Sequence, residues 1–125
     1  MEKIFINHTN HPSVYWDKNE LQEANAYGKV IDISFPTISP VAETSDIWEM
    51  ARDNAKRIAE LSPVAVLCQG EFTYTYALVT ELIKRNICVL AACSERIVED
   101  YLAEDGSIKH ISQFRFRRFR HYGCI

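Results

Sequence analysis

The residues best suited to chemistry stand in a polar segment near the N-terminus, Asn7-His8-Thr9-Asn10-His11-Pro12-Ser13. His8 and His11 could act as general acids or bases or contact a phosphate, because imidazole changes its charge near neutral pH. They could equally cap loop carbonyls, which is a structural role. With Cys93 they would offer zinc three ligands, but no second ligand pair accompanies them, and we expect no metal. The other ligand-binding candidates of this segment are Asn7, Thr9, Asn10 and Ser13.

A second polar segment, Gln69-Gly70-Glu71-Phe72-Thr73, follows an apolar run and opens a predicted helix. Gly70 lets a ligand or another backbone approach closely. The free amides of 71–73 and the helix dipole favour an anion. Glu71 suits a ribose hydroxyl or an adenine amino group, or is simply an acid of the first helical turn. The ligand-binding candidates here are Gln69, Gly70, Phe72 and Thr73.

Two common nucleotide-binding patterns are missing from the sequence. The second polar segment contains no Gly-Lys-Ser/Thr, and no Gly-x-Gly-x-x-Gly follows the first predicted strand. These absences exclude a Walker loop and the usual dinucleotide-binding turn.

A third polar segment, Cys93-Ser94-Glu95-Arg96, follows another apolar run. Ser94 lacks the Gly-x-Ser-x-Gly elbow of a nucleophile, and Cys93 has no His at a known offset. Arg96 is better suited to clamp a phosphate, because its guanidinium is permanently charged and bidentate. The plainer alternative is an exposed ion pair between Arg96 and Glu95 or Glu99. Ser94 and Glu95 are counted among the ligand-binding candidates.

The elements that must position these segments alternate between short apolar runs and longer amphipathic stretches. Helices are expected from Asp17 to Gly28, from Thr44 or Ser45 to the Ser62-Pro63 stop, and over 73–85. Strands are expected over 3–7, 30–33, 64–68 and 87–92. This order predicts an open, mostly parallel α/β sheet flanked by helices, a single Rossmann-like domain. The three polar segments would then meet at the carboxyl edge of the sheet.

The C-terminal quarter breaks the alternation. Asp105-Gly106 is a hairpin signal between 97–102 and 108–119, where aromatic residues and arginines alternate. We expect an antiparallel β-hairpin at the edge of the sheet, with a helix over 94–102 as the alternative. Residues 107–125 carry five cations and no acids, so this tail is basic and the rest of the chain acidic. Such a strand could stack bases, join subunits, or be a half-buried strand with a solvated face.

The composition bounds the class of protein. The chain has 125 residues, 47% of them apolar and 25% charged, with a net charge of −3. These values predict one globular domain over 1–125, with a βα core over 1–96 and the hairpin and basic tail over 97–125. No apolar run is long enough for a membrane span, and no secretory signal is visible. Four cysteines without a Cys-x-x-Cys pair indicate reduced thiols and a cytoplasmic protein.

The small α/β frame and the His-containing opening of 7–13 resemble the CRISPR-associated Rossmann-fold (CARF) domains and the small ring nucleases of type III CRISPR systems. The resemblance covers roughly residues 3–96. It implies a homodimer or higher homo-oligomer that binds a cyclic oligoadenylate, with cyclic tetra-adenylate expected first. Cleavage, where it occurs, would need no metal and no cofactor: a ribose 2′-hydroxyl attacks the adjacent phosphate. Some such proteins only sequester the ring, and both outcomes stay open.

The resemblance also assigns roles by position. Arg96 and the amides of 70–73 would hold phosphates, and His8 or His11 would move the proton. Two other functions remain possible from the residues themselves. One is a small nucleoside- or nucleotide-processing enzyme that uses Glu71 as acid, base or nucleophile. The other is a non-catalytic module whose basic hairpin binds a protein or a single-stranded nucleic acid.

Overall fold

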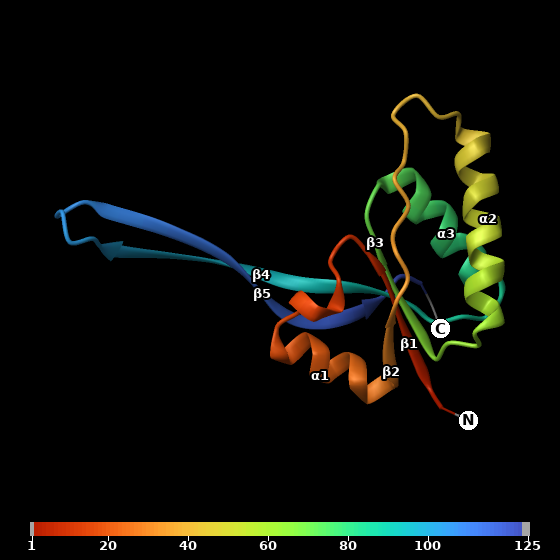
Figure 1. Ribbon diagram of the computed structural model, residues 1–125, viewed down its shortest axis with the longest axis horizontal. Helices are drawn as coiled ribbons and strands as arrows, with labels where there is room; N and C mark the ends of the chain where they lie inside the picture. Colours follow the sequence, from red (N-terminus) through yellow and green to blue (C-terminus); the bar gives the residue numbers. More distant parts are fainter. Residues whose placement is uncertain (1, 124–125) are drawn as a thin grey trace.

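A computed structural model describes residues 2–123 as a mixed α/β fold with one five-stranded sheet (Figure 1). The strand order is β2-β1-β3-β4-β5. β2, β1, β3 and β4 run parallel, and β5 runs antiparallel to β4. The expected mostly parallel sheet with a C-terminal antiparallel hairpin is confirmed. The strands are β1 (Ile4–Thr9), β2 (Lys29–Asp32), β3 (Ala65–Gln69), β4 (Val89–Leu102) and β5 (Ile108–His121).

Helices cover both faces of the sheet. α1 (Lys18–Tyr27) lies on one face beside β5, and α2 (Thr44–Glu60) and α3 (Phe72–Lys84) lie on the other (Figure 1). Neighbouring residues of a strand point to opposite faces, so each strand feeds both core layers. In β1, Ile6 packs in the layer under α2 and α3, whereas Phe5 packs in the layer under α1. Burial on both faces explains why the central strand β3 is apolar at every position from Ala65 to Cys68.

The helix boundaries follow local capping, with two corrections to the sequence expectation. Asp17 caps α1 by accepting a hydrogen bond from the Glu20 amide at 2.8 Å, as expected. α2 begins one residue early, because Glu43 is its cap and the Asp46 carboxylate accepts from the Glu43 amide. α3 begins at Phe72 because Glu71 caps it. No helix within residues 2–123 is both long and apolar enough to cross a membrane.

β4 does not end where the apolar run ends, which corrects the expected loop over 93–96. It continues to Leu102 because β5 pairs with it along its whole length, from Leu90↔His121 to Leu102↔Ile108. The alternative helix over 94–102 is therefore wrong. The turn lies at Asp105-Gly106 as expected, where Gly106 has a φ of +86°, a conformation that glycine adopts without steric cost.

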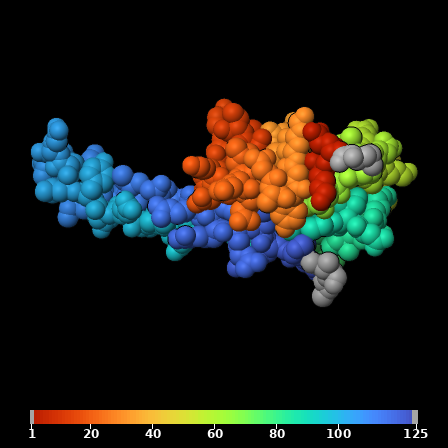
Figure 2. Space-filling model, turned by 90° about the horizontal axis from the view of Figure 1, so that it is seen from below, coloured from red at the N-terminus to blue at the C-terminus, as the bar shows by residue number. Residues whose placement is uncertain are grey.

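A β-bulge interrupts the ladder between Cys93 and Ser94. Arg118 pairs with Cys93, but Phe116 pairs with Ser94, so Arg117 is an extra residue in β5. Because of this extra residue, Phe116 and Phe119 point to the same face and both pack in the layer under α1. Beyond the bulge the hairpin leaves the body as a long projection, here called the arm and comprising residues 94–116 (Figures 1 and 2).

Candidate functional site

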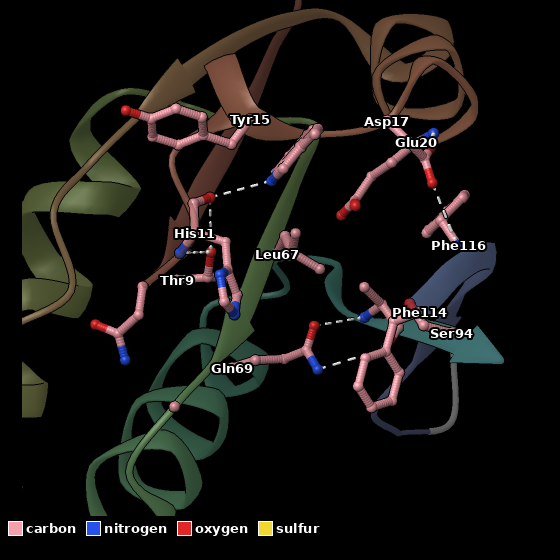
Figure 3. Close-up of a pocket in the computed structure, with 14 residues that line it drawn as sticks. Thr9, His11, Tyr15, Asp17, Glu20, Leu67, Gln69, Ser94, Phe114 and Phe116 are labelled. Atoms are coloured by element: carbon pink, nitrogen blue, oxygen red, sulfur yellow. Dashed lines mark hydrogen bonds between the residues drawn. The ribbon is translucent and has the colours of Figure 1, made fainter. Parts of the chain in front are cut away.

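A cavity of about 610 Å³ opens at the carboxyl ends of β1 and β3, next to the N-terminal end of α1 (Figure 3). The strand order of the sheet reverses between β1 and β3, and such reversal points are where open α/β sheets bind ligands. We call this cavity the edge pocket. Its lining residues are Thr9, Asn10, His11, Tyr15, Trp16, Asp17, Glu20, Leu67, Gln69, Gly70, Ala92, Ser94, Phe114 and Phe116.

The sequence candidates divide between this pocket and other places. The pocket brings together candidates from all three polar segments: Thr9, Asn10, His11, Gln69, Gly70 and Ser94. The remaining candidates do not line it: Asn7, His8, Ser13, Glu71, Phe72, Thr73, Glu95 and Arg96. The expected convergence at the carboxyl edge therefore holds for part of the set.

His8 is buried on the opposite side of β1 from the pocket, in a closed hydrogen-bond chain. Its Nδ1 lies 2.9 Å from the Ile33 carbonyl, which can only accept, so Nδ1 carries the proton. Its Nε2 then accepts from the Tyr74 hydroxyl at 2.8 Å, and that hydroxyl accepts from Asn54 Nδ2 at 2.9 Å. Burial lowers the pKa of His8, which favours this neutral form. His8 thus joins β1, the segment after β2, α2 and α3.

Tyr74→Phe should destabilise the fold by about 1–3 kcal/mol, because it leaves buried His8 Nε2 without its donor and Asn54 without its acceptor. The free energy of unfolding in urea measures the change. Tyr76→Phe is the matched control, since Tyr76 is exposed on the same helix, and it should change stability by less than about 0.5 kcal/mol. Equal losses in the two variants would contradict the assigned chain.

Asn7 and Ser13 hold the first polar segment in place. Asn7 Nδ2 donates to Asp32 Oδ1 and to the His11 carbonyl, both at 2.9 Å. Ser13 donates to the Asp32 carboxylate through both its hydroxyl and its amide. Trp16 Nε1 also donates to the His11 carbonyl at 3.1 Å. The backbone of His11 is fixed from several sides, while its imidazole turns toward the pocket (Figure 3).

Gln69 extends the sheet rather than facing a ligand freely. Its Oε1 accepts from the Ala92 amide at 2.8 Å, and its Nε2 lies 3.4 Å from the Ala92 carbonyl (Figure 3). The side-chain amide thereby imitates one more backbone pair between β3 and β4, beyond Val66↔Val89 and Leu67↔Leu90. It forms the floor of the pocket at the point where β4 leaves β3.

At the start of α3, where an anion site is expected from the sequence, the Glu71 carboxylate occupies part of the helix N-terminus. The Glu71 carboxylate accepts from the amides of Thr73 and Tyr74, so these amides are not free. A side chain at Gly70 would collide with the Phe35 ring, since a Cβ there would lie 2.3 Å from it. Gly70 is thus needed for packing on its Phe35 side. Phe72 is 91% exposed and stands outside the edge pocket.

Arg96 and Glu95 lie within β4 on the arm instead of in a loop. Glu95 forms an ion pair with Arg117, the extra residue of the bulge. Arg96 Nε donates to Ser112 Oγ at 2.7 Å, and neither Glu95 nor Glu99 pairs with it. Successive residues alternate between faces, so Arg96 shares a face with Ser94, which lines the pocket. Arg96 therefore stands just outside the rim of the edge pocket.

Sequence reasoning missed the acidic wall of the pocket. The sequence indicates only a helix start at Asp17 and assigns no site role to Asp17 or Glu20, yet both line the cavity. Burial, followed by the nearby Asp17 carboxylate, raises the pKa of Glu20 to about 7. Asp17 Oδ2 also accepts from the Phe116 amide at 3.3 Å, which ties α1 to β5. The residues around Asp17 and Glu20 do not by themselves indicate a pocket wall, because β5, almost a hundred residues later in the chain, completes that wall.

Glu20→Gln should change how stability depends on pH. In the wild type the folded carboxyl stays protonated up to a pKa of about 7, above its usual 4.5. Wild-type stability therefore falls as pH rises from about 4.5 to 7 and stays low above that. Glutamine cannot ionise, so Glu20→Gln should gain about 1–2 kcal/mol over the wild type between pH 4.5 and 8, after discounting partial solvation.

Urea unfolding across this pH range measures the gain. Glu23→Gln is the control, because Glu23 is exposed on the same helix. A stability difference between Glu20→Gln and the wild type that is the same at every pH would contradict the raised pKa.

The pocket is polar and aromatic without being basic. None of its lining residues is Lys or Arg. Among residues 2–123, no group of three His, Cys, Asp or Glu side chains is placed to hold a metal ion. Cys68, Cys88 and Cys93 are free thiols, and Cys124 lies outside the described residues. Burial raises the pKa of the Cys68 thiol to about 12, so it is not a nucleophile near neutral pH.

Comparison with known proteins places this fold and pocket in a family. The family model described as "Uncharacterized protein MJ1673 family" matches residues 3–120. The chain belongs to the MJ1673 family. The matched range includes both walls of the edge pocket and the whole arm.

One relative of the MJ1673 family is "Uncharacterized protein MJ1673" of Methanocaldococcus jannaschii. It is 39% identical over 57 residues, which are 46% of this chain and 43% of the relative. The aligned region thus spans less than half the length of that relative. No solved structure matches the chain.

Proposed function

We propose that this member of the MJ1673 family binds a cyclic oligoadenylate at the edge pocket, with cyclic tetra-adenylate as the ring, and sequesters or cleaves it. The observation that carries the proposal is the lining of the pocket at the β1/β3 reversal point. There, aromatic rings and hydrogen-bonding groups surround one cavity, the combination that recognises a base and its ribose. The proposal includes a Rossmann-like, CARF-like assignment for the parallel part of the sheet.

The pocket suits an adenine base in particular. Tyr15 and Phe114 present exposed rings at its mouth, on which a base can stack. Glu20 has a pKa of about 7 and is partly protonated at neutral pH. A protonated carboxyl donates to adenine N1 through its hydroxyl and accepts from the N6 amino group through its carbonyl oxygen. An ionised carboxylate makes only the second of these bonds.

The phosphates would lie outside the cavity. The pocket lining holds no cation, so the phosphates of the ring would face the mouth, where Arg96 stands beyond Ser94 on the arm. A drug-sized ligand fills a pocket of roughly 300–1,000 Å³, and a ring of four nucleotides is several times larger than such a ligand. One edge pocket of about 610 Å³ therefore receives one part of the ring.

Cleavage would proceed without a metal. A ribose 2′-hydroxyl attacks the neighbouring phosphorus, the bond to the 5′-oxygen breaks, and a cyclic 2′,3′-phosphate and a 5′-hydroxyl are formed. His11 would accept the proton of the 2′-hydroxyl, because its imidazole turns into the pocket whereas that of His8 is buried and bonded on both nitrogens. The leaving 5′-oxygen would take its proton from water at the open mouth, because the Glu20 carboxyl is engaged with the adenine base.

Calorimetry with cyclic tri-, tetra- and hexa-adenylate tests binding. We expect micromolar or tighter binding of cyclic tetra-adenylate at pH 6, and weaker binding at pH 8 as Glu20 ionises. Glu20→Gln should bind equally at both pH values, because an amide both donates and accepts. Tyr15→Ala should weaken binding about 5- to 150-fold through lost stacking. Tyr76→Ala, an exposed tyrosine on the other side of the sheet, is the control.

Absence of binding by every ring at micromolar protein would overturn the proposal. Binding of adenosine or its monophosphate without any ring would favour the small nucleoside-processing enzyme instead. Incubation of the protein with cyclic tetra-adenylate in the presence of a metal chelator separates metal-independent cleavage from sequestration. Cyclic 2′,3′-phosphate products that disappear in His11→Ala indicate cleavage, and an intact ring indicates sequestration.

The basic-hairpin alternative receives less support from the structure. The arm holds the cations Arg96, Lys109 and Arg115, but its β4 strand and turn carry five acids. Arg117, just beyond the arm, pairs with Glu95. Antiparallel pairing thus sets the basic tail against an acidic strand, which reduces its attraction for a polyanion.

A further inference from the structure

The arm exposes an apolar stripe that nothing in residues 2–123 covers. Paired residues of antiparallel strands share a face, so the face that carries Ser94 and Phe116 of the pocket continues outward along the arm. The pairs on this face are Arg96–Phe114, Val98–Ser112, Asp100–His110 and Leu102–Ile108. Phe114, Leu102, Ile108 and Val98 on it are 73%, 72%, 65% and 56% exposed.

An isolated two-stranded hairpin is at best marginally stable in water. The base of the arm is held by α1, since Phe116 packs under that helix and its amide donates to Asp17. The outer part of the arm extends past the body (Figures 1 and 2). On this face exposed apolar side chains are interspersed with Arg96 and with the Asp100–His110 ion pair, and such a mixture of apolar and charged groups suits an interaction surface. The question is which partner the stripe fits.

We propose that the arm packs face to face against the arm of a second copy of this chain, about a two-fold axis that crosses the ribbon at Val98 and Ser112. The charges of the stripe are complementary under this operation. Arg96 and Asp100 stand two residues on either side of Val98, so Arg96 of one copy meets Asp100 of the partner subunit, twice across the interface.

The opposite face of the arm does not have this complementarity. There β4 presents Glu95, Ile97 and Glu99. A two-fold axis at Ile97 would set Glu95 against Glu99 of the partner subunit, which is a repulsive arrangement of like charges. Its apolar residues Tyr101 and Ile111 are also less exposed than those of the stripe. The charge pattern therefore selects the face that leads to the pocket.

The same register places the tip of each arm over the edge pocket of the other copy. Leu102 and Ile108 form a pair four residues outward from the axis, and Ser94 and Phe116 form a pair four residues inward. The partner's Leu102 and the partner's Ile108 therefore lie against Ser94 and Phe116, which line the pocket. The partner thus adds apolar residues to each edge pocket on its Ser94 and Phe116 side, and the rest of the mouth stays open. This assembly concerns the arm itself and does not require the proposed ligand.

Charge-reversal variants of Arg96 and Asp100, studied without nucleotide, test where the two-fold axis crosses the arm. Light scattering after size-exclusion should give twice the chain mass of 14.4 kDa for the wild type. Arg96→Asp and Asp100→Arg alone should each weaken association at least about tenfold, and the double variant should restore it, because both ion pairs are then reversed. Circular dichroism checks that each variant keeps its fold. A monomeric wild type at tens of micromolar, or a double variant as weak as the singles, would overturn the inference.

Cross-linking tests the same axis without relying on charge. Val98→Cys places a thiol beside its own counterpart across the two-fold axis, so mild oxidation should give a covalent dimer. Gln113→Cys is the control, since Gln113 pairs with Ile97 on the opposite face, and the wild type reports any linkage through the native cysteines. A dimer formed by edge-to-edge strand pairing or by the body would leave Val98→Cys unlinked and would refute the proposed packing. A confirmed dimer that binds no ring would refute the proposed function alone.

Discussion

The ladder between β4 and β5 is the interaction on which the rest of this structure depends. It begins inside the body at Leu90↔His121 and continues for the full length of both strands. Its inner part brings Phe116 and Phe119 under α1, where they close the second core layer with Phe5 and Leu67. Its outer part carries β4 away from β3 and makes the arm. The pocket lies at the point where the two parts meet.

The polar residues from Asn7 to Ser13 have two kinds of role: some hold the backbone in place, and others line the edge pocket. His8 and Asn7 are buried, and their hydrogen bonds join β1 to the last residue of β2 and to the segment that follows it. These bonds fix the backbone of His11, whose side chain is then free to face the cavity. His8 belongs to the buried hydrogen-bond chain and its neighbour Thr9 lines the pocket, because successive side chains of a strand point to opposite faces. A satisfied, buried framework of this kind gives a pocket a defined shape before any ligand arrives.

The parts of the fold that depend on local pattern could be predicted from sequence. β3 and the start of β4 are continuous apolar runs, Asp17 caps a helix within three residues of itself, and Asp105-Gly106 forms a turn on its own. The extension of β4 could not be predicted, because residues 94–102 are extended only through pairing with a strand further along the chain. The role of Glu71 depends on which way one carboxylate turns. The raised pKa of Glu20 depends on burial beside Asp17, in a wall that β5 completes.

The bulge at Arg117 lets β5 carry one residue more than regular pairing with β4 requires. With the bulge absorbing this residue, Phe114 and Phe116 lie on the same face as Phe119, so the arm and the body share a single side of the ribbon. Loss of the extra residue would remove the bulge and restore regular alternation along β5, because Phe116 would then follow Arg118 directly. Phe116 would stay on the face of Phe119, and the aromatic residues of the arm would still turn toward α1. Relatives can therefore differ by one residue at this point of β5 and keep the same side of the ribbon turned toward the pocket.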